Sequence, residues 1–189
     1  MTAQVRVGDW MQTFTGKAFY PIDPRPEELD PTDMAHALGM LCRYGGHSSE
    51  FYSVAEHCVL MSHAVTPIHA LWALMHDATE AYLVDLPRPL KRSLSGYDAV
   101  EARLMAVICQ RFHLRESMPE EVKLADNRIL VDERAALMRP APLPWASIEN
   151  VEPLGVELMC WSPAEAAEAW INRFNDLTGL EPPDWTAKP

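Results

Sequence analysis

The residues best suited to chemistry lie together at positions 76–80, in the sequence HDATE. In a helix, Glu80 lies one turn beyond both His76 and Asp77, so the three side chains share a face. The preceding residues 68–75 are mostly apolar and predict a buried helix. Buried carboxylates are strongly unfavourable unless they pair or bind a cation, so the cluster predicts a divalent metal site. The alternatives are a helix end that reaches solvent and a hydrogen-bonded core histidine.

Two residues elsewhere in the chain extend this candidate site. His57 follows a predicted helix start at Ser53 and falls in the first turn of that helix. Asp126 falls inside a later predicted helix, next to apolar positions, and an acid in that setting needs a partner. Taken alone, His57 could be a surface residue near a helix start, and Asp126 could be half of a salt bridge.

Together these residues resemble the H…HD…D signature of the HD-domain phosphohydrolases, across roughly residues 33–139. The sequence VAEH at 54–57 resembles the first-histidine helix of that family. HDATE followed by DLPRPLK at 85–91 is similar to the branch of bacterial 5′-deoxynucleotidases and phage dATP triphosphohydrolases. Arg43-Tyr44 resembles the Arg-Trp pair of that branch, with Tyr44 where the family has a Trp that abuts the sugar.

The resemblance implies one divalent metal ion, and the four ligands of the family fall on His57, His76, Asp77 and Asp126. Imidazole and carboxylate ligands suit zinc, manganese, cobalt, nickel or iron. A polyphosphate substrate would bring additional magnesium. The ion held by the four ligands can lower the pKa of a bound water and draw charge from a phosphoryl oxygen. Asp77 would serve both as a ligand of this ion and in catalysis. Glu80 is not a ligand in the family pattern, so we expect it to transfer protons; orienting His76 is the alternative.

A phosphate substrate needs local cations, since the chain as a whole is acidic. We expect Arg43 to offer a bidentate fork and Lys91 a point charge. The resemblance suggests that Asp85 accepts a hydrogen bond from a sugar hydroxyl, and His47, after two glycines, is a further candidate for substrate contact. The alternatives are a helix-terminal charge for Arg43, turn capping for Asp85 and a surface position for His47. Arg88 and Arg92 are expected to be solvated.

The function predicted first is hydrolysis of a phosphate ester at the 5′ position of a nucleotide. The enzyme is either a 5′-deoxynucleotidase, which releases phosphate from dNMPs, or a dNTP triphosphohydrolase such as a dATPase, which Lys91 slightly favours. The alternatives are another HD-type hydrolase, acting on guanosine tetraphosphate or a cyclic dinucleotide, and a non-catalytic metal-bound nucleotide sensor. Family members are often oligomers, so we expect a homo-oligomer.

These residues need helices to position them. The fold class predicted is all-α: an HD-domain helical bundle of about six helices in a single domain, residues 1–189. Residues 1–30 are irregular or form a short β-hairpin around Gly16, and residues 31–139 form the helical catalytic core. A Pro-rich excursion covers 140–161, and a C-terminal helix covers 162–178. The expected helices run over about 31–43, 53–65, 67–83, 97–112, 117–139 and 162–178.

Composition narrows the class of protein further. The chain has 189 residues, 48% of them apolar, and a formal net charge of -11. Such acidity argues against general nucleic-acid binding, which needs a basic surface. The four cysteines are scattered, with no C-x-x-C pair, and no apolar stretch is long enough for a membrane span or signal segment. We therefore expect a cytoplasmic protein.

Overall fold

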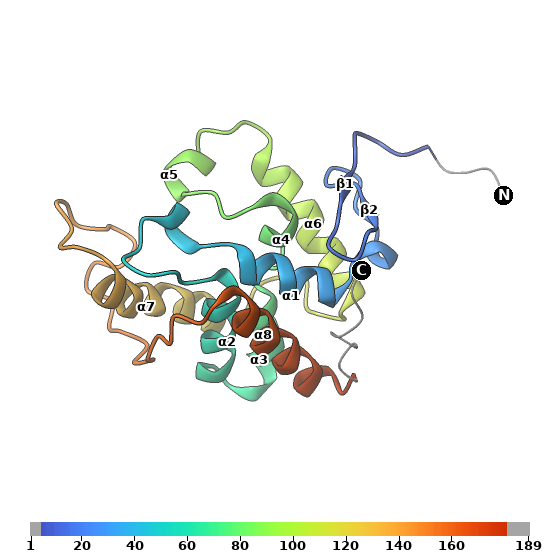
Figure 1. Ribbon diagram of the computed structural model, residues 1–189. Coiled ribbons are helices and arrows are strands. Elements are labelled where there is room, and N and C mark those ends of the chain that lie inside the picture. Colours follow the sequence, from blue (N-terminus) through green and yellow to red (C-terminus); the bar gives the residue numbers. More distant parts are fainter. Residues whose placement is uncertain (1–4, 181–189) are drawn as a thin grey trace.

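The computed structural model describes residues 5–180, which are mostly helical (Figure 1). A two-stranded antiparallel sheet comes first, and three 3₁₀ turns lie at Pro26–Glu28, Arg43–Gly46 and Pro67–His69. The elements are β1 (Met11–Gln12), β2 (Ala18–Phe19), α1 (Pro31–Met40), α2 (Val54–Ala64), α3 (Ala70–Met75), α4 (Glu80–Leu83), α5 (Arg88–Lys91), α6 (Tyr97–Arg111), α7 (Glu120–Leu137) and α8 (Pro163–Thr178). No helix among them is both long and apolar enough to cross a membrane.

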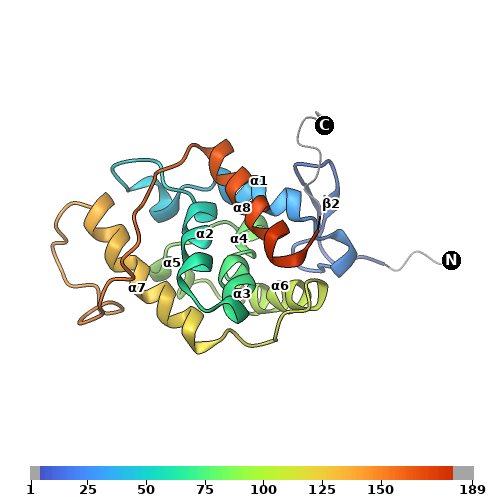
Figure 2. The same cartoon turned by 90° about the horizontal axis from the view of Figure 1, so that it is seen from below.

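Helices α1 and α8 lie side by side and pack on α2 and α3, while α7 lies at one end and α6 and the hairpin at the other (Figures 1 and 2). Gly39 in α1 allows the close approach of α8, because a Cβ there would lie 2.7 Å from the Pro163 carbonyl oxygen. On α8, Trp170 and Phe174 are buried and stacked with their ring centroids 5.6 Å apart, which confirms their predicted core role.

The hairpin predicted around Gly16 is confirmed, and so are the limits of α2, α6 and α8 to within a few residues. The capping box predicted at Ser162 is also present, with Glu165 closing it. The segment 140–161 contains no helix or strand, as its prolines predict.

The first predicted helix ends earlier than expected, at Met40 and not at Arg43. Leu41 is extended, Cys42 forms an antiparallel bridge with Ser53, and the Arg43 amide donates to the Tyr52 carbonyl. This pairing just before α2 breaks the helix and places Arg43 beside the start of α2. Tyr44 follows with a left-handed backbone, at φ 58°.

The helix predicted over 67–83 is divided. Between α3 and α4 the amides of Ala78 and Glu80 donate to carbonyls three residues back, so the chain winds more tightly there than an α-helix. This tighter turn aligns Asp77 with Glu80, because residues three apart eclipse each other in a 3₁₀ helix. Ile68, expected to be buried, is 85% exposed in the turn before α3.

Two of the predicted helix starts differ from the structure. The Ser53 hydroxyl accepts the Glu56 amide, but the Glu56 carboxylate accepts backbone amides from residues 159–161 and does not close a capping box. The sequence SMPE at 117–120 predicts a capping box that opens the next long helix, but α7 begins after Pro119 without a side-chain cap, so this prediction is wrong. The prolines in DLPRP at 85–89 predict an extended loop, which is interrupted at Arg88, where α5 begins.

Candidate metal centre

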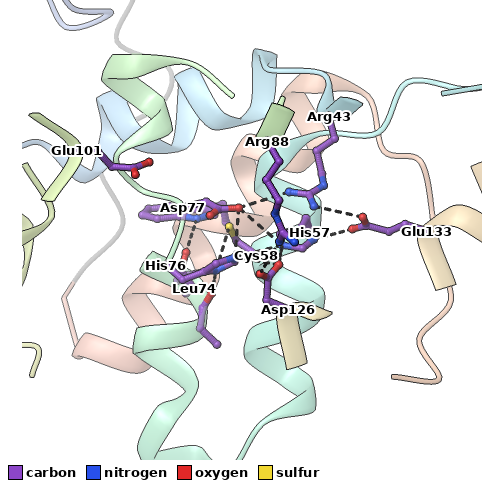
Figure 3. Close-up of polar contacts among 12 residues, drawn as sticks. Arg43, His57, Cys58, Leu74, His76, Asp77, Arg88, Glu101, Asp126 and Glu133 are labelled. Atoms are coloured by element: carbon purple, nitrogen blue, oxygen red, sulfur yellow. Dashed lines mark hydrogen bonds and ion pairs between the residues drawn. The ribbon is translucent and has the colours of Figure 1, made fainter. Parts of the chain in front are cut away.

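Four side chains from three parts of the fold meet in one place (Figure 3). His57 comes from α2, His76 and Asp77 come from the tight turn after α3, and Asp126 comes from α7. The Nε2 atoms of the two histidines are 3.2 Å apart. Both histidines are buried, and the two aspartate side chains are little more than a fifth exposed. We refer to these four residues as the four-residue cluster.

The spacing within the four-residue cluster suits a single ion. From Nε2 of His57, the nearest oxygens of Asp77 and Asp126 lie at 3.7 and 3.6 Å. From Nε2 of His76, the same oxygens lie at 3.2 and 4.0 Å. Ligand atoms about 2.1 Å from one ion are about 3.0–3.4 Å apart when adjacent and about 4.2 Å apart when opposite. The distances between the two histidine nitrogens and from each of them to the carboxylate oxygens therefore lie within a few tenths of an ångström of those that one ion requires.

The outer nitrogens of both histidines are already occupied. Nδ1 of His76 lies 2.7 Å from the Ala73 carbonyl oxygen, which can only accept, so this nitrogen donates. Nδ1 of His57 lies 2.6 Å from a carboxylate oxygen of Glu133 and donates to it. A neutral histidine that donates through Nδ1 presents a lone pair at Nε2. Two nitrogen lone pairs and two carboxylate oxygens thus face one another, and this donor set fits a divalent cation.

The electrostatics of the cluster agree with a cation site. Burial acts against ionisation of Asp77, but His76 and other positive neighbours outweigh it and lower the pKa of Asp77. The pKa of Asp126 is lowered in the same way, because its interactions with His57 and His76 outweigh burial. Burial lowers the pKa of His76, yet Asp77 raises it further, so the net shift is upward. The carboxylates thus favour positive charge at this position, as they would favour a cation bound between them.

A second grouping, Cys58 with His76 and Asp77, also has its donor atoms close together. The Cys58 sulfur lies 3.9 Å from Nδ1 of His76, the nitrogen that already donates to Ala73. Burial raises the pKa of the Cys58 thiol, which opposes the thiolate that a metal needs. The four-residue cluster is therefore the better metal site, and Cys58 packs behind it (Figure 3).

Glu80 is a partly buried acid next to Asp77 on the tight turn. Its Oε2 atom has no hydrogen-bond partner among residues 5–180. Burial raises the pKa of Glu80, and the negative charges of Asp77 and Asp85 raise it further. Glu80 therefore keeps its proton to a higher pH than a free glutamate does, as a proton-transfer group would need.

Arg43 and Tyr44 reach the site, where carboxylates already engage both terminal nitrogens of Arg43 and the hydroxyl of Tyr44, while Nε of Arg43 has no hydrogen-bond partner among residues 5–180. The buried Arg43 guanidinium lies 3.4 Å from Asp77 and 3.3 Å from Glu133. The Tyr44 hydroxyl donates to Glu133, and the Tyr44 ring is tilted against Trp145 with the centroids 6.0 Å apart. Tyr44 thus joins the segment 140–161 to the metal centre.

The other residues predicted to bind substrate do not all lie close to the four-residue cluster. Asp85 is half-buried, and burial raises its pKa although Arg43 opposes the shift. His47 is exposed, and its side chain makes no hydrogen bond or ion pair with the cluster. Lys91 pairs with Glu101 and lies over the ring of Tyr97, so it is not brought to the cluster.

Two residues next to the cluster, Glu133 and Arg88, were not predicted from the sequence to belong to the site. Glu133 lies seven residues after Asp126, two turns further along one face of α7, and that spacing was the available signal. Arg88 is exposed, as expected, but its guanidinium also lies 3.7 Å from Asp126, which was not expected. Nothing in the sequence singled out Arg88 from its basic neighbours.

Comparison with known proteins adds relatives of unassigned function. No model of a known protein family matches the chain. The uncharacterized protein YfdR of Escherichia coli (strain K12) is 39% identical over 172 residues, which are 90% of this chain and 97% of YfdR. The uncharacterized protein RCAP_rcc00048 of Rhodobacter capsulatus is 33% identical over 126 residues, 61% of this chain and 64% of that protein. The chain belongs to the same family as YfdR.

Proposed function

We propose that this protein is an HD-type, metal-dependent phosphohydrolase that cleaves the phosphate ester at the 5′ position of a nucleotide, a deoxynucleotide in the first instance. The observation that carries the proposal is the donor set of the four-residue cluster. Two imidazole nitrogens and two carboxylate oxygens converge, and both outer imidazole nitrogens are held by hydrogen bonds. The H…HD…D resemblance supports the same assignment.

A divalent ion held there would polarise a phosphoryl oxygen and acidify a water. Zinc, manganese, cobalt, nickel and iron all suit these ligands. The residues of the chain supply the rest. Glu133 and the Ala73 carbonyl fix the rings of His57 and His76, and Arg43 holds Asp77 through its guanidinium. The reaction site is thus organised before any substrate arrives.

Glu80 is assigned the proton transfer. In the hydrolysis, the oxygen of water bonds to phosphorus and the bond between phosphorus and the 5′ oxygen breaks. The leaving oxygen takes the proton of Glu80, and Glu80 recovers a proton from the attacking water. The raised pKa of the buried Glu80 carboxyl suits the first of these transfers.

The test is release of phosphate from a panel of dNMPs, NMPs and dNTPs by the manganese- or cobalt-loaded protein. Guanosine tetraphosphate and a cyclic dinucleotide extend the panel to the other HD-type substrates. The control is Asp77→Ala, which removes one ligand of the cluster. Orthophosphate from monophosphates, absent with Asp77→Ala, supports a nucleotidase, and intact triphosphate from dNTPs a triphosphohydrolase. If the metal-loaded protein binds nucleotides without hydrolysing them, the protein is a nucleotide sensor and the proposal of an enzyme is wrong.

A further inference from the structure

The cations expected to bind phosphate are not free. Arg43 is buried between Asp77 and Glu133, and its charge is used by those carboxylates. The Glu133 carboxylate accepts hydrogen bonds from Arg43, Tyr44 and His57, so it is fully engaged where it lies. Lys91 is paired with Glu101. Neither residue offers an unpaired charge to a ligand.

The metal centre would therefore be close to neutral. The two charges of a divalent ion are matched by Asp77 and Asp126, and Arg43 is matched by Glu133. The protein as a whole carries a formal net charge of -11. A phosphate monoester dianion approaching this centre thus needs a further positive group close to the ion.

Arg88 is placed to be that group. Its guanidinium lies 3.7 Å from Oδ2 of Asp126, which is beyond hydrogen-bond distance, and its side chain is 49% exposed. In Figure 3 it extends across His57 toward Asp126. An ion bound to Asp126 would take up the charge that now attracts Arg88, which frees the guanidinium for another anion.

Within the part of the chain that the structure describes, the salt bridges of Asp77 and Asp126 with arginine or lysine involve Arg43 and Arg88. Arg43 has two carboxylate partners, whereas Arg88 has one distant partner. A guanidinium matches the geometry of a phosphate group with two parallel hydrogen bonds. One such fork serves one phosphate group, while a triphosphate would need more cations than the site leaves free.

We propose that Arg88 is the phosphate-binding residue of this site and that the site takes a single phosphate group, as in a phosphate monoester. The inference rests on the proposed function and deepens it from nucleotides in general to monophosphates. It differs from the prediction made from the sequence, in which Arg43 and Lys91 bind phosphate and Lys91 slightly favours a triphosphate.

The experiment is calorimetric titration of inorganic phosphate, and separately of tripolyphosphate, into the manganese-loaded protein. Wild type is compared with Arg88→Met, Arg88→Lys and the matched control Arg92→Met, whose arginine lies directly after α5, the helix that begins at Arg88. Arg88→Met should weaken phosphate binding about tenfold or more, because a charge-assisted bidentate contact is lost. Arg88→Lys should restore part of the affinity, and Arg92→Met should stay within about twofold of wild type. Arg88→Met should not weaken manganese binding, since it removes a competing cation from Asp126.

Each contrary result has a separate meaning. If wild type binds phosphate and Arg88→Met binds it as tightly, the role of Arg88 is wrong and the proposed function stands. An equal loss with Arg92→Met would also overturn it, since the effect would be one of general charge. Tripolyphosphate binding more than about tenfold tighter than phosphate would overturn the single-phosphate part. If manganese-loaded wild type binds no phosphate at all, both the proposed function and this inference are wrong.

Discussion

An oxygen of the Glu133 carboxylate lies 2.6 Å from Nδ1 of His57, and both side chains are completely buried. The contact turns the Nε2 lone pair of His57 toward the other three members of the cluster. Glu133 also accepts hydrogen bonds from Arg43 and Tyr44. One carboxylate outside the four-residue cluster therefore orients a ligand and holds the segment that carries Arg43 and Tyr44.

Replacing Glu133 with glutamine should weaken metal binding. The amide keeps the shape of the carboxylate but loses its charge, so His57 is less firmly oriented and Arg43 loses a partner. We expect the metal affinity to fall by about 10–100-fold, measured by competition with a chelator. The exposed Glu120→Gln on the same helix is the matched control. Unchanged affinity would show that Glu133 plays no part in orienting His57.

Glu80→Gln should separate chemistry from metal binding. The amide cannot give up a proton, so turnover should fall by about 10²–10⁴-fold while the metal content stays that of wild type. The raised pKa of Glu80 also fixes the sign of the pH dependence. Turnover that needs the protonated acid is present below that pKa and lost as the pH rises through it, and the variant should lack this alkaline decline. Turnover close to wild type would remove Glu80 from the mechanism.

Glu56→Gln should loosen the segment before α8. The Glu56 carboxylate accepts the backbone amides of Met159, Cys160 and Trp161, at 2.7–2.9 Å. A glutamine can offer one oxygen to these donors and turns its own N–H groups toward the rest. We expect the free energy of unfolding to fall by about 2–3 kcal/mol.

Hydrogen exchange locates this effect. The amides of residues 159–161 should exchange faster in Glu56→Gln than in wild type, because they lose their acceptor. The exposed Glu157→Gln in the same segment should leave both stability and exchange unchanged. Unchanged exchange in Glu56→Gln would mean that the segment is held by other contacts.

Glu121 provides a pH prediction away from the metal centre. Hydrogen bonds from Thr66 and His69 lower the pKa of Glu121 from 4.5 to about 2. A carboxyl whose pKa is lower in the folded state contributes stability that is fully present above pH 4.5 and lost as the pH falls towards 2. The contribution is small, because the side chain is 36% exposed and its partners are screened by solvent. A carboxyl titration by NMR should find the midpoint near 2, and a midpoint near 4.5 would contradict the contact.

Most of the candidate metal ligands could be singled out from the sequence because their signals are local. His76, Asp77 and Glu80 share a helical face within five residues, and Asp126 is an acid at an otherwise apolar helix position. The helix limits were predictable where capping and breaking residues agree, as at Ser162 with Glu165.

The features that the sequence did not predict depend on tertiary contacts that local sequence patterns do not show. Glu56 satisfies the sequence rule for a capping box, yet its carboxylate is taken by amides more than 100 residues away. Lys91 was predicted to bind phosphate, but in the structure it pairs with Glu101 of α6. The bridge between Cys42 and Ser53 shortened α1, and nothing local at Leu41 forbids a helix. Tertiary contacts outweigh local preference at each of these positions.

The most direct test of the account is X-ray absorption spectroscopy on the protein loaded with cobalt, after titration has established how many ions each chain binds. The four-residue cluster predicts one ion per chain, with nitrogen and oxygen neighbours that include two imidazoles and no sulfur. The His76→Gln variant should lose most of the bound cobalt, and Cys58→Ala should retain it. Sulfur in the first coordination shell, or the absence of saturable binding by wild type, would contradict the metal centre on which the proposed function rests.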